Sequence, residues 1–493
     1  MADYEGYVVY GKKNNKRQAF GVISNNSECK AVSKRIPSNL KKIIVEIEDK
    51  RFYQHHGIDI HGIIRASIQN FKAKKIVQGG STITQQLSRN MLRVNNKTLY
   101  RKIRESIKAL ELENQYSKDE ILDLYFNNVY WGKNIIGLRS ASLHYFGKEI
   151  HYLTQEESLT LLTILRGPNY YLKNKDKLAF RYNLLNSILL ERKNITNKRH
   201  KKNLDKFPLL QNNPIQILRR EVIPFITESI EDKKCVIKST IDNNLQALIN
   251  KIINSSNQPI SIVSIQNGKI IAFGSRFGSD YPFITKANVG STLKPFIYCF
   301  LRKNGVLNEK YSSYTNKLDW TVREATTVKP YLTIQAALLV SNNNVFINSC
   351  EKVGMDICLD YLSDIFNKNR EYFYPSSILG ATECGISLYE LAIAYNNFFK
   401  CKSLDSYKIE CLNILKLNAR NKLGFNIDNV FLKTGTTNDN QERYAILGNP
   451  DKVFAILRNE KYNSDTEKEG SFVKQIRDFA SLVLNTRKNY KWT

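Results

Sequence analysis

Gln-Gly-Gly-Ser-Thr-Ile-Thr-Gln-Gln-Leu-Ser-Arg-Asn, residues 78–90, is the stretch that decides how this chain is interpreted. It contains two glycines, several hydroxyls and three glutamines, followed by Arg89 and a further amide, and only Ile83 and Leu87 are apolar. Glycines let a backbone approach a ligand closely, hydroxyls and amides bond to polar substrates, and an arginine suits phosphate. The run therefore predicts a substrate-binding segment rather than a polar loop that caps a helix.

The composition limits the classes of protein and of partner. At 493 residues the chain is too long for one core, and 42% hydrophobic residues indicate folded domains. Lys and Arg number 74 against 46 Asp and Glu, a net charge of +28, which favours an anionic partner. Because no nucleic-acid-binding motif is recognisable, we expect anionic lipid headgroups or a phosphorylated substrate, and no nucleic acid.

Cysteine spacing and hydropathy give two further expectations. The eight cysteines show no CxxC spacing, so buried free thiols are expected. No window approaches the roughly 18–20 apolar residues that span a bilayer, and the N-terminus lacks the apolar segment of a signal peptide. We therefore expect any membrane attachment to be peripheral, through the protein surface.

The pattern of apolar residues changes along the chain. Residues 1–36 are polar and mixed, with a short strand predicted at Tyr7–Tyr10 and little else. From 37 to about 171 the pattern is helical, and a boundary is expected near residue 215, within a Lys- and Asn-rich connector over 172–234. Three domains follow: an N-terminal segment 1–36, a helical domain 37–215 with its connector, and a domain 216–493.

Local signals support the helical interpretation of the first part. Leu40, Ile43, Ile44 and Ile47 form one apolar helix face that ends at Glu48, and another face consists of Ile103, Ile107 and Leu110. Ser117 with Glu120, and Thr154 with Glu157, have the spacing of capping boxes, and an apolar run follows each pair.

After residue 216 strands alternate with helices. Residues 260–265 and 269–273, separated by Asn267-Gly268, predict a hairpin with a tight turn. Further strands are expected at 430–432, 444–447 and 453–457, and helices at 291–303, 331–340 and 387–399. The second part is therefore predicted to be α/β with an antiparallel sheet.

Two carboxylates and a cationic cluster carry the chemistry of the first part. Glu48 follows an amphipathic helix, and Arg101 and Lys102 stand four and three residues before Glu105, on the same helix face. One carboxylate acting as a base, and a second beside cations, suit glycosyl transfer from a sugar pyrophosphate. Taken alone, Arg101 and Glu105 would be an ordinary surface ion pair, and His55 and His56 are expected to be turn histidines rather than metal ligands.

Five motifs together resemble the peptidoglycan glycosyltransferase domain of bifunctional, class A penicillin-binding proteins. They occur in family order across roughly residues 40–171: Glu48-Asp49-x-x-Phe52-x-x-His55-x-Gly57, the run 78–90, Arg101-Lys102-x-x-Glu105, residues 121–127 (Ile-Leu-Asp-Leu-Tyr-Phe-Asn) and residues 145–148 (Tyr-Phe-Gly-Lys). The resemblance implies a lysozyme-like, mostly α domain that polymerises lipid II.

The resemblance also implies roles for residues of this domain. Glu48 would deprotonate the acceptor sugar hydroxyl, and Glu105, Arg89, Arg101 and Lys102 would stabilise the departing lipid pyrophosphate, with a divalent cation (Mg or Mn) as a candidate cofactor. Substrate contacts would come from Asp49, Phe52, His55, Gly80, Ser81, Thr82, Gln85, Gln86 and Asn90.

The second part contains three short sequence motifs whose order along the chain is informative. Ser291-Thr-Leu-Lys294 opens a predicted helix, Ser341-Asn-Asn343 follows, and Lys433-Thr-Gly-Thr436 comes directly after an apolar strand. Each motif alone is weak evidence, but together they resemble the penicillin-recognising serine acyltransferases. The resemblance implies a penicillin-binding transpeptidase domain whose antiparallel sheet is flanked by helices.

This second resemblance implies a nucleophile and its partners. Ser291 would attack the D-Ala-D-Ala carbonyl, and Lys294 would accept its proton if burial and Lys433 lower its pKa. Ser341 would relay the proton to the leaving amine, and Asn343 would orient the substrate. The terminal carboxylate would be bound by Lys433, Thr434 and Thr436 around Gly435, and the backbone amides of Ser291 and Thr436 would form the oxyanion hole.

The chain also departs from the family pattern. The distances along the sequence from Ser291 to Ser341 and on to Lys433 are short for the family, and the segment after Thr437 lacks the usual continuation. Substrate range is therefore open, and so is the way in which a chain without an apolar span reaches a membrane-bound substrate.

The predicted function is a two-domain peptidoglycan synthase that polymerises lipid II and cross-links stem peptides at the outer face of the bacterial cytoplasmic membrane. Its expected partners are lipid II, nascent peptidoglycan, the anionic membrane surface, β-lactam and moenomycin-type inhibitors and other cell-wall synthesis proteins. Three alternatives remain: a glycan hydrolase with a carboxypeptidase or β-lactamase, an active glycosyltransferase whose second domain is a D,D-carboxypeptidase or a β-lactam- or muropeptide-binding scaffold, and a fusion that acts on another cell-wall-like substrate.

Overall fold

The protein is represented by a computed structural model, and two compact units make up its chain. The structure describes residues 4–74, 79–92, 98–205, 207, 208, 210–313, 322, 330–400, 405–424, 429–437, 442–459 and 469–484. The first unit comprises residues 1–11, 17–220 and 227–239, and the second comprises 12–16, 221–226 and 240–493. Residue 215, where we expected the boundary, lies inside the first unit, and residues 227–239 return to it.

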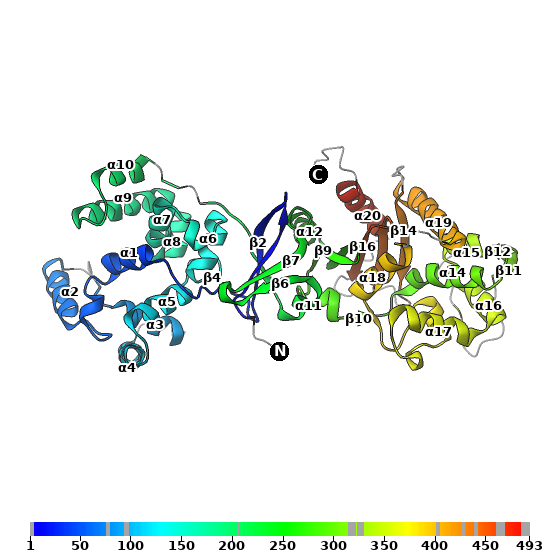
Figure 1. Ribbon diagram of the computed structural model, residues 1–493, viewed down its shortest axis with the longest axis horizontal. Coiled ribbons are helices and arrows are strands. Elements are labelled where there is room, and N and C mark those ends of the chain that lie inside the picture. The colour runs from blue at the N-terminus through cyan, green and yellow to red at the C-terminus, as the bar shows by residue number, and fades with distance from the viewer. Residues whose placement is uncertain are drawn as a thin grey trace. The chain divides into compact units, whose positions relative to one another are not determined.

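The first unit is mostly helical (Figure 1). Both predicted capping boxes are present, at Ser117 with Glu120 and at Thr154 with Glu157, and they start two of its helices. Its helices are α1 Ser38–Glu48, α2 Ile60–Lys72, α3 Ile83–Leu92, α4 Leu99–Gln115, α5 Lys118–Asn128, α6 Leu138–Phe146, α7 Gln155–Leu165, α8 Pro168–Lys173, α9 Lys175–Glu191 and α10 Asn197–Asp205.

Strands also occur in the N-terminal segment. A five-stranded sheet has the order β5-β2-β1-β7-β6, and a second pair joins β3 to β4. The strand expected at Tyr7–Tyr10 overlaps β1, but the expectation of little other regular structure in residues 1–36 is wrong, because Val8 and Val22 are fully buried in a small core with Ala31 and Leu143. The strands are β1 Val8–Lys13, β2 Lys16–Ile23, β3 Cys29–Lys30, β4 Ile135–Ile136, β5 Gln216–Leu218, β6 Thr227–Glu231 and β7 Val236–Asp242.

The two predicted apolar helix faces have different environments. On α1, Leu40, Ile43 and Ile44 are buried in the main core of the unit, as predicted. On α4, the face of Ile103, Ile107 and Leu110 is exposed. Helix α2 is exposed too, at Ile60, Ile63, Ile64, Ile68 and Phe71. The periodicity thus predicted the helix, but not what covers its apolar side.

The second unit is built on an antiparallel sheet of order β14-β15-β16-β8-β9 (Figure 1). Successive side chains of a strand point to opposite faces. On β14, Leu432 joins a core with α12, α19 and α20, and Phe431 stacks on Tyr395 of α18. Helices therefore cover both faces, as the sequence predicts.

Turn chemistry determines one hairpin of this sheet. Asn267 and Gly268 both have positive φ, 52° and 77°, which is the conformation of a type I′ turn. The predicted hairpin is confirmed, with β8 at Ile260–Gln266 and β9 at Lys269–Ser275; the other strands are β10 Lys286–Ala287, β11 Lys310–Ser312, β12 Tyr331–Thr333, β13 Ile386–Ser387, β14 Phe431–Thr436, β15 Glu442–Gly448 and β16 Lys452–Asn459.

The predicted helices of the second unit are also present. A 3₁₀ turn at Gly290–Leu293 leads into α14. The helices are α11 Ile223–Ile226, α12 Asn243–Ser255, α13 Tyr281–Ile284, α14 Lys294–Lys303, α15 Ile334–Val340, α16 Asn343–Val353, α17 Met355–Phe366, α18 Leu388–Phe399, α19 Ser406–Leu423 and α20 Glu469–Leu484. In the part of the chain that the structure describes, no helix has the length and apolar character needed to cross a membrane.

Candidate active sites

Glu48 is the last residue of α1, and α3 holds its carboxylate. Gln86 on α3 donates a hydrogen bond from Nε2 to Glu48 Oε2 at 3.4 Å, and its Oε1 accepts one from Tyr125 at 3.1 Å. Tyr125 is fully buried. Burial, and then the neighbouring Glu48, raise the pKa of its hydroxyl far above the ordinary range, while Arg89 lowers it. The tyrosine therefore remains a hydrogen-bond donor that orients Gln86 toward Glu48.

The carboxylate of Asp49, the residue after Glu48, bonds to other groups of the protein. Its Oδ2 accepts the backbone N–H of Ile83 at 2.9 Å, at the start of α3, and both its oxygens lie 3.1 Å from His55 Nε2. Thr82 Oγ1 donates to the carbonyl of Gly57 at 2.6 Å. Asp49, His55 and Thr82 are all buried. They join the 49–57 turn to the N-terminus of α3. These buried contacts therefore position the residues of the site without lying on its surface.

Phe52 and Gln85 are also beneath the surface. Phe52 is fully buried, and Lys118 Nζ lies 4.4 Å from the centroid of its ring. Gln85 is buried and donates from Nε2 to Ser106 Oγ on α4 at 3.1 Å. Direct substrate contact, implied for these side chains by the resemblance, is not available to them in this conformation. Their contacts instead hold α3 against its neighbours.

Glu105 lies in a cationic cluster on α4. Arg101 Nε is 3.1 Å from its Oε1, and Lys102 Nζ is 3.3 Å from its Oε2. Lys102 also donates to Ser81 Oγ at 2.9 Å, which links the polar run to this carboxylate. The predicted shared face of these residues is confirmed. Because Glu105 is only 2% exposed, the two cations neutralise a carboxylate that has lost nearly all its water.

The remaining residues of the polar run differ in exposure. Arg89 is exposed and Asn90 is half-buried, so both can meet a ligand. A Cβ on Gly80 would lie 3.0 Å from Ile63 Cα, whereas a Cβ on Gly79 would meet nothing within 4 Å. Gly80 therefore allows α2 to pack closely, and only Gly79 leaves open space for a ligand. Gln78 lies outside the described residues.

Arg181 on α9 is a residue of this site that sequence reasoning missed. Its pKa is lowered by burial above all, and Glu48 is among the groups that oppose this shift, so the two charges are close enough to interact. The signal was an arginine on an apolar helix face, beside Tyr182 and Leu185. The sequence predicts a connector over residues 172–234, but α9 packs into the core of the first unit.

The residues that the structure describes do not form a protein-held metal site. Within the described ranges, no group of three or more His, Cys, Asp or Glu side chains could hold a metal ion. Glu105, which would lie nearest to a pyrophosphate, is paired with Arg101 and Lys102. The donor set therefore suits an anion better than a cation.

In the second unit, Ser291 lies in a turn made by close backbone packing. Gly290 has φ +56°, and a Cβ there would meet the carbonyl oxygen of Thr436 at 2.5 Å. Gly380 packs against the same turn, and the N–H of Val289 donates to its carbonyl at 3.0 Å. The backbones beside Ser291 and Thr436 are therefore adjacent, as an oxyanion hole formed by their amides would require.

Lys294 follows one 3₁₀ turn after Ser291, and side chains three residues apart eclipse in such a turn. It is fully buried. Its Nζ donates to the carbonyl of Ser341 at 2.6 Å and to Asn343 Oδ1 at 2.5 Å. The first and second motifs are therefore joined directly through this lysine.

Lys433 connects the third motif to the second. Its Nζ donates to Ser341 Oγ at 2.6 Å and to the carbonyl of Thr434 at 2.7 Å. Burial, and then the charges of Lys294 and Lys422, hold the pKa of Lys433 far below its usual range. Ser341 has φ 58°, a strained conformation that this network stabilises.

The Lys433-Thr-Gly-Thr436 motif lies on β14. Thr434 is half-buried and Thr436 is exposed on β14, and a Cβ on Gly435 would lie 2.6 Å from the carbonyl of Val289. Gly435 is therefore needed for the strand to approach the Ser291 turn. The unusual continuation after Thr437 begins at residues 438–441, which lie outside the described residues.

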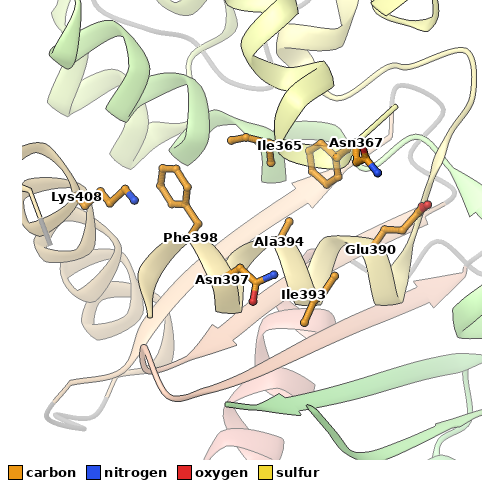
Figure 2. A pocket seen from close by; sticks show the side chains of 9 residues that line it. Ile365, Asn367, Glu390, Ile393, Ala394, Asn397, Phe398 and Lys408 are labelled. Atoms are coloured by element: carbon orange, nitrogen blue, oxygen red, sulfur yellow. The ribbon is translucent and has the colours of Figure 1, made fainter. Parts of the chain in front are cut away.

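A separate cavity of about 450 Å³ lies in the second unit, and none of the predicted site residues lines it (Figure 2). Its wall includes Phe398, with Lys408 Nζ 4.3 Å from the ring centroid. Glu390, another wall residue, pairs with Lys368 at 2.9 Å. Its two charged wall residues, Glu390 and Lys408, thus each have a partner within the protein.

Comparison with known proteins agrees with both resemblances. The family described as Transglycosylase matches residues 16–189. Penicillin-binding protein 1A/1B of Bacillus subtilis is 28% identical over 410 residues, 74% of this chain and 44% of that protein. Penicillin-binding protein 4 of Bacillus subtilis is 27% identical over 435 residues, 74% of this chain and 67% of that protein.

A solved structure shows the same fold. The crystal structure of penicillin-binding protein 1A from Haemophilus influenzae matches 99% of this chain and 94% of that one, with a TM-score of 0.50 and 12% sequence identity. The predicted fold class, a helical region followed by an α/β region with an antiparallel sheet, is thereby confirmed. The chain spans less than half the length of the first Bacillus relative.

Proposed function

Because the chain belongs to the class A penicillin-binding proteins, with a transglycosylase domain at residues 16–189, we propose that it is a bifunctional peptidoglycan synthase. The first unit polymerises lipid II into glycan strands. The second unit cross-links stem peptides by serine acyl transfer. Lipid II, nascent peptidoglycan, and the β-lactam and moenomycin-type inhibitors are the ligands of these two sites.

The observation that carries the first activity is the arrangement of Glu48 and Glu105 around α3. Glu48 is half-buried, bonded to Gln86, and takes the proton of the acceptor hydroxyl. The hydroxyl oxygen then bonds to the anomeric carbon of the donor as the bond from that carbon to the lipid pyrophosphate breaks. Arg89, Arg101 and Lys102 stabilise the negative charge of the pyrophosphate.

In this scheme, no group of side chains among the described residues holds a divalent cation. If magnesium or manganese takes part, its ligands include oxygens of the pyrophosphate, because the side chains around Glu105 are cationic. A requirement for metal would be measured as loss of polymerisation in a chelator and its recovery with Mg²⁺.

The exposed apolar face of α2 supports access to a substrate held in a membrane. Ile64, Ile68 and Phe71 are 53%, 51% and 85% exposed on one helix, and Arg65 and Lys72 accompany them. An amphipathic helix with basic residues binds at the surface of an anionic bilayer. We propose that this face attaches the first unit peripherally to the outer surface of the bacterial cytoplasmic membrane.

The observation that carries the second activity is the lysine-centred network that joins the three motifs. Ser291 attacks the D-Ala-D-Ala carbonyl, and its proton passes to Lys294. The amides of Ser291 and Thr436 stabilise the oxyanion. Ser341, bonded to Lys433, delivers a proton to the leaving amine, and Asn343 orients the peptide. The resulting acyl-enzyme is released by the amine of a second stem peptide, or by water in the carboxypeptidase alternative.

Polymerisation of purified lipid II tests the first activity. We expect glycan polymer from the wild type, a loss of about 10²- to 10⁴-fold in Glu48→Gln, and inhibition by a moenomycin-type compound. Polymer formation that Glu48→Gln leaves unchanged would refute the assigned base. Shortening of existing glycan without polymer formation would establish the hydrolase alternative instead.

Labelled penicillin tests the second activity. We expect a covalent adduct in the wild type and none in Ser291→Ala. Release of D-Ala with cross-linked dimers indicates a transpeptidase, and release without dimers indicates a D,D-carboxypeptidase. A wild type that forms no adduct would leave a non-covalent scaffold as the function of the second unit.

A further inference from the structure

The charge of Lys433 is poorly placed for binding a substrate carboxylate. Its side chain is fully buried, and its ammonium group donates to Ser341 Oγ and to the carbonyl of Thr434. A lysine has three N–H donors, so two of them are already directed to groups of the protein. Burial and two neighbouring lysines also lower its pKa well below its usual range.

A second lysine stands at the same strand. Lys422, in the last turn of α19, donates from Nζ to Thr434 Oγ1 at 2.8 Å. It is half-buried, unlike Lys433. Thr434 is the hydroxyl that the family resemblance assigns to the terminal carboxylate. The cation is therefore adjacent to the expected position of that carboxylate.

The packing of α19 along β14 explains this contact. Asn418, one turn before Lys422, donates from Nδ2 to the carbonyl of Leu432 at 3.1 Å. Four residues of helix rise about 6 Å and two residues of strand about 6.6 Å. The spacing from Asn418 to Lys422 along the helix therefore matches the spacing from residue 432 to residue 434 along the strand. Gly424, with φ 71°, ends the helix directly afterwards.

We infer that Lys422 is a carboxylate-binding cation of the acyl-transfer site, which selects peptides and β-lactams that carry a free carboxylate. The inference rests on the proposed acylation of Ser291. An ammonium beside a hydroxyl gives a carboxylate a charge-assisted hydrogen bond together with a neutral one. Lys422 then binds the carboxylate, and Lys433 takes part in proton transfer through Ser341.

The test compares a free carboxylic acid with its methyl ester, which lacks this charge. The rate constant for acylation of Ser291 is measured with benzylpenicillin and with its methyl ester, for the wild type and for Lys422→Met. We expect the variant to lose about 10- to 100-fold in rate with the free acid, and to change little with the ester. Lys422→Arg keeps a cation and is expected to restore most of the preference for the acid.

Lys416→Met is the matched control, because Lys416 lies on the same helix and bonds to Asn429 at 3.1 Å. It should keep the acid-to-ester ratio of the wild type. An equal loss of rate with both ligands in Lys422→Met would mean that the lysine only supports the strand, and would overturn the inference. Unchanged rates with both ligands would also overturn it. Absence of any adduct in the wild type would instead overturn the acylation itself, and the inference with it.

Discussion

Glu105 of the first unit and Lys433 of the second are both almost inaccessible to water, but the groups around their side chains have opposite effects on the charged form. Glu105 has Arg101 and Lys102 one helical turn before it, so its charge is neutralised by nearby cations. Lys433 bonds to a hydroxyl and a carbonyl, and burial and the nearby lysines lower its pKa. An anionic leaving group needs permanent cations, whereas proton transfer needs a lysine that can lose its proton.

The largest effect is expected for Lys433→Ala. The variant removes the hydrogen bond to Ser341 Oγ, so acylation by labelled penicillin should fall about 10²- to 10⁴-fold, while lipid II polymerisation is unchanged. Lys269→Ala, at an exposed lysine of the same sheet, is the control. Equal loss in both assays would show that the variant disturbs folding and that the two sites are not independent.

Gly290→Ala tests how closely the second site is packed. A Cβ there combines a positive φ with a contact of 2.5 Å to the carbonyl of Thr436. We expect a loss of roughly 2–4 kcal/mol in the free energy of unfolding of the second unit, together with slower acylation. Gly268→Ala has a positive φ but meets nothing within 4 Å, so it should cost only about 1 kcal/mol. Equal losses would mean that backbone conformation alone requires Gly290.

Phe71→Ser tests the apolar face of α2. Removing an exposed aromatic side chain should weaken binding to phosphatidylglycerol-containing vesicles about tenfold, without lowering the free energy of unfolding. Cosedimentation with vesicles measures the change. Leu417→Ser, an exposed apolar residue on α19 of the second unit, should leave binding unchanged. Equal effects of both variants would contradict a specific role for α2.

The smallest effect concerns pH. Burial, and then the charge of Lys133, lower the pKa of His144 to about 4, and its Nε2 is buried without a hydrogen-bond partner among the described residues. An unfolded histidine binds its proton near pH 6.5, so the first unit should lose stability as the pH falls from about 6.5 to about 4. The slope contributed is a fraction of the roughly 1.4 kcal/mol per pH unit of one proton, since the ring is partly exposed. His144→Gln should flatten this part of the stability profile, and an unaltered profile would contradict the assignment.

Much of the architecture was predictable because its signals are local. A capping box spans four residues, a type I′ turn is set by Asn267-Gly268, and the face shared by Arg101 and Glu105 follows from helical spacing. The strand at Val8–Lys13 overlaps the one expected at Tyr7–Tyr10, but β2 and the five-stranded sheet were missed, because that sheet joins segments distant in the chain, as in the pairing of Gly21 with Gln216. The role of α9 was missed for the same reason.

Of the sites, the sequence by itself determined which chemical groups are present and in what order, from Glu48 to Lys433. Only the tertiary structure decided which of them reach a ligand. It buried Asp49, Phe52 and Gln85 beneath the first site, left the apolar face of α2 exposed, and brought Lys422 to Thr434. The physical reason is that burial and hydrogen-bond partners depend on segments packed from distant parts of the chain, whereas residue type and local spacing do not.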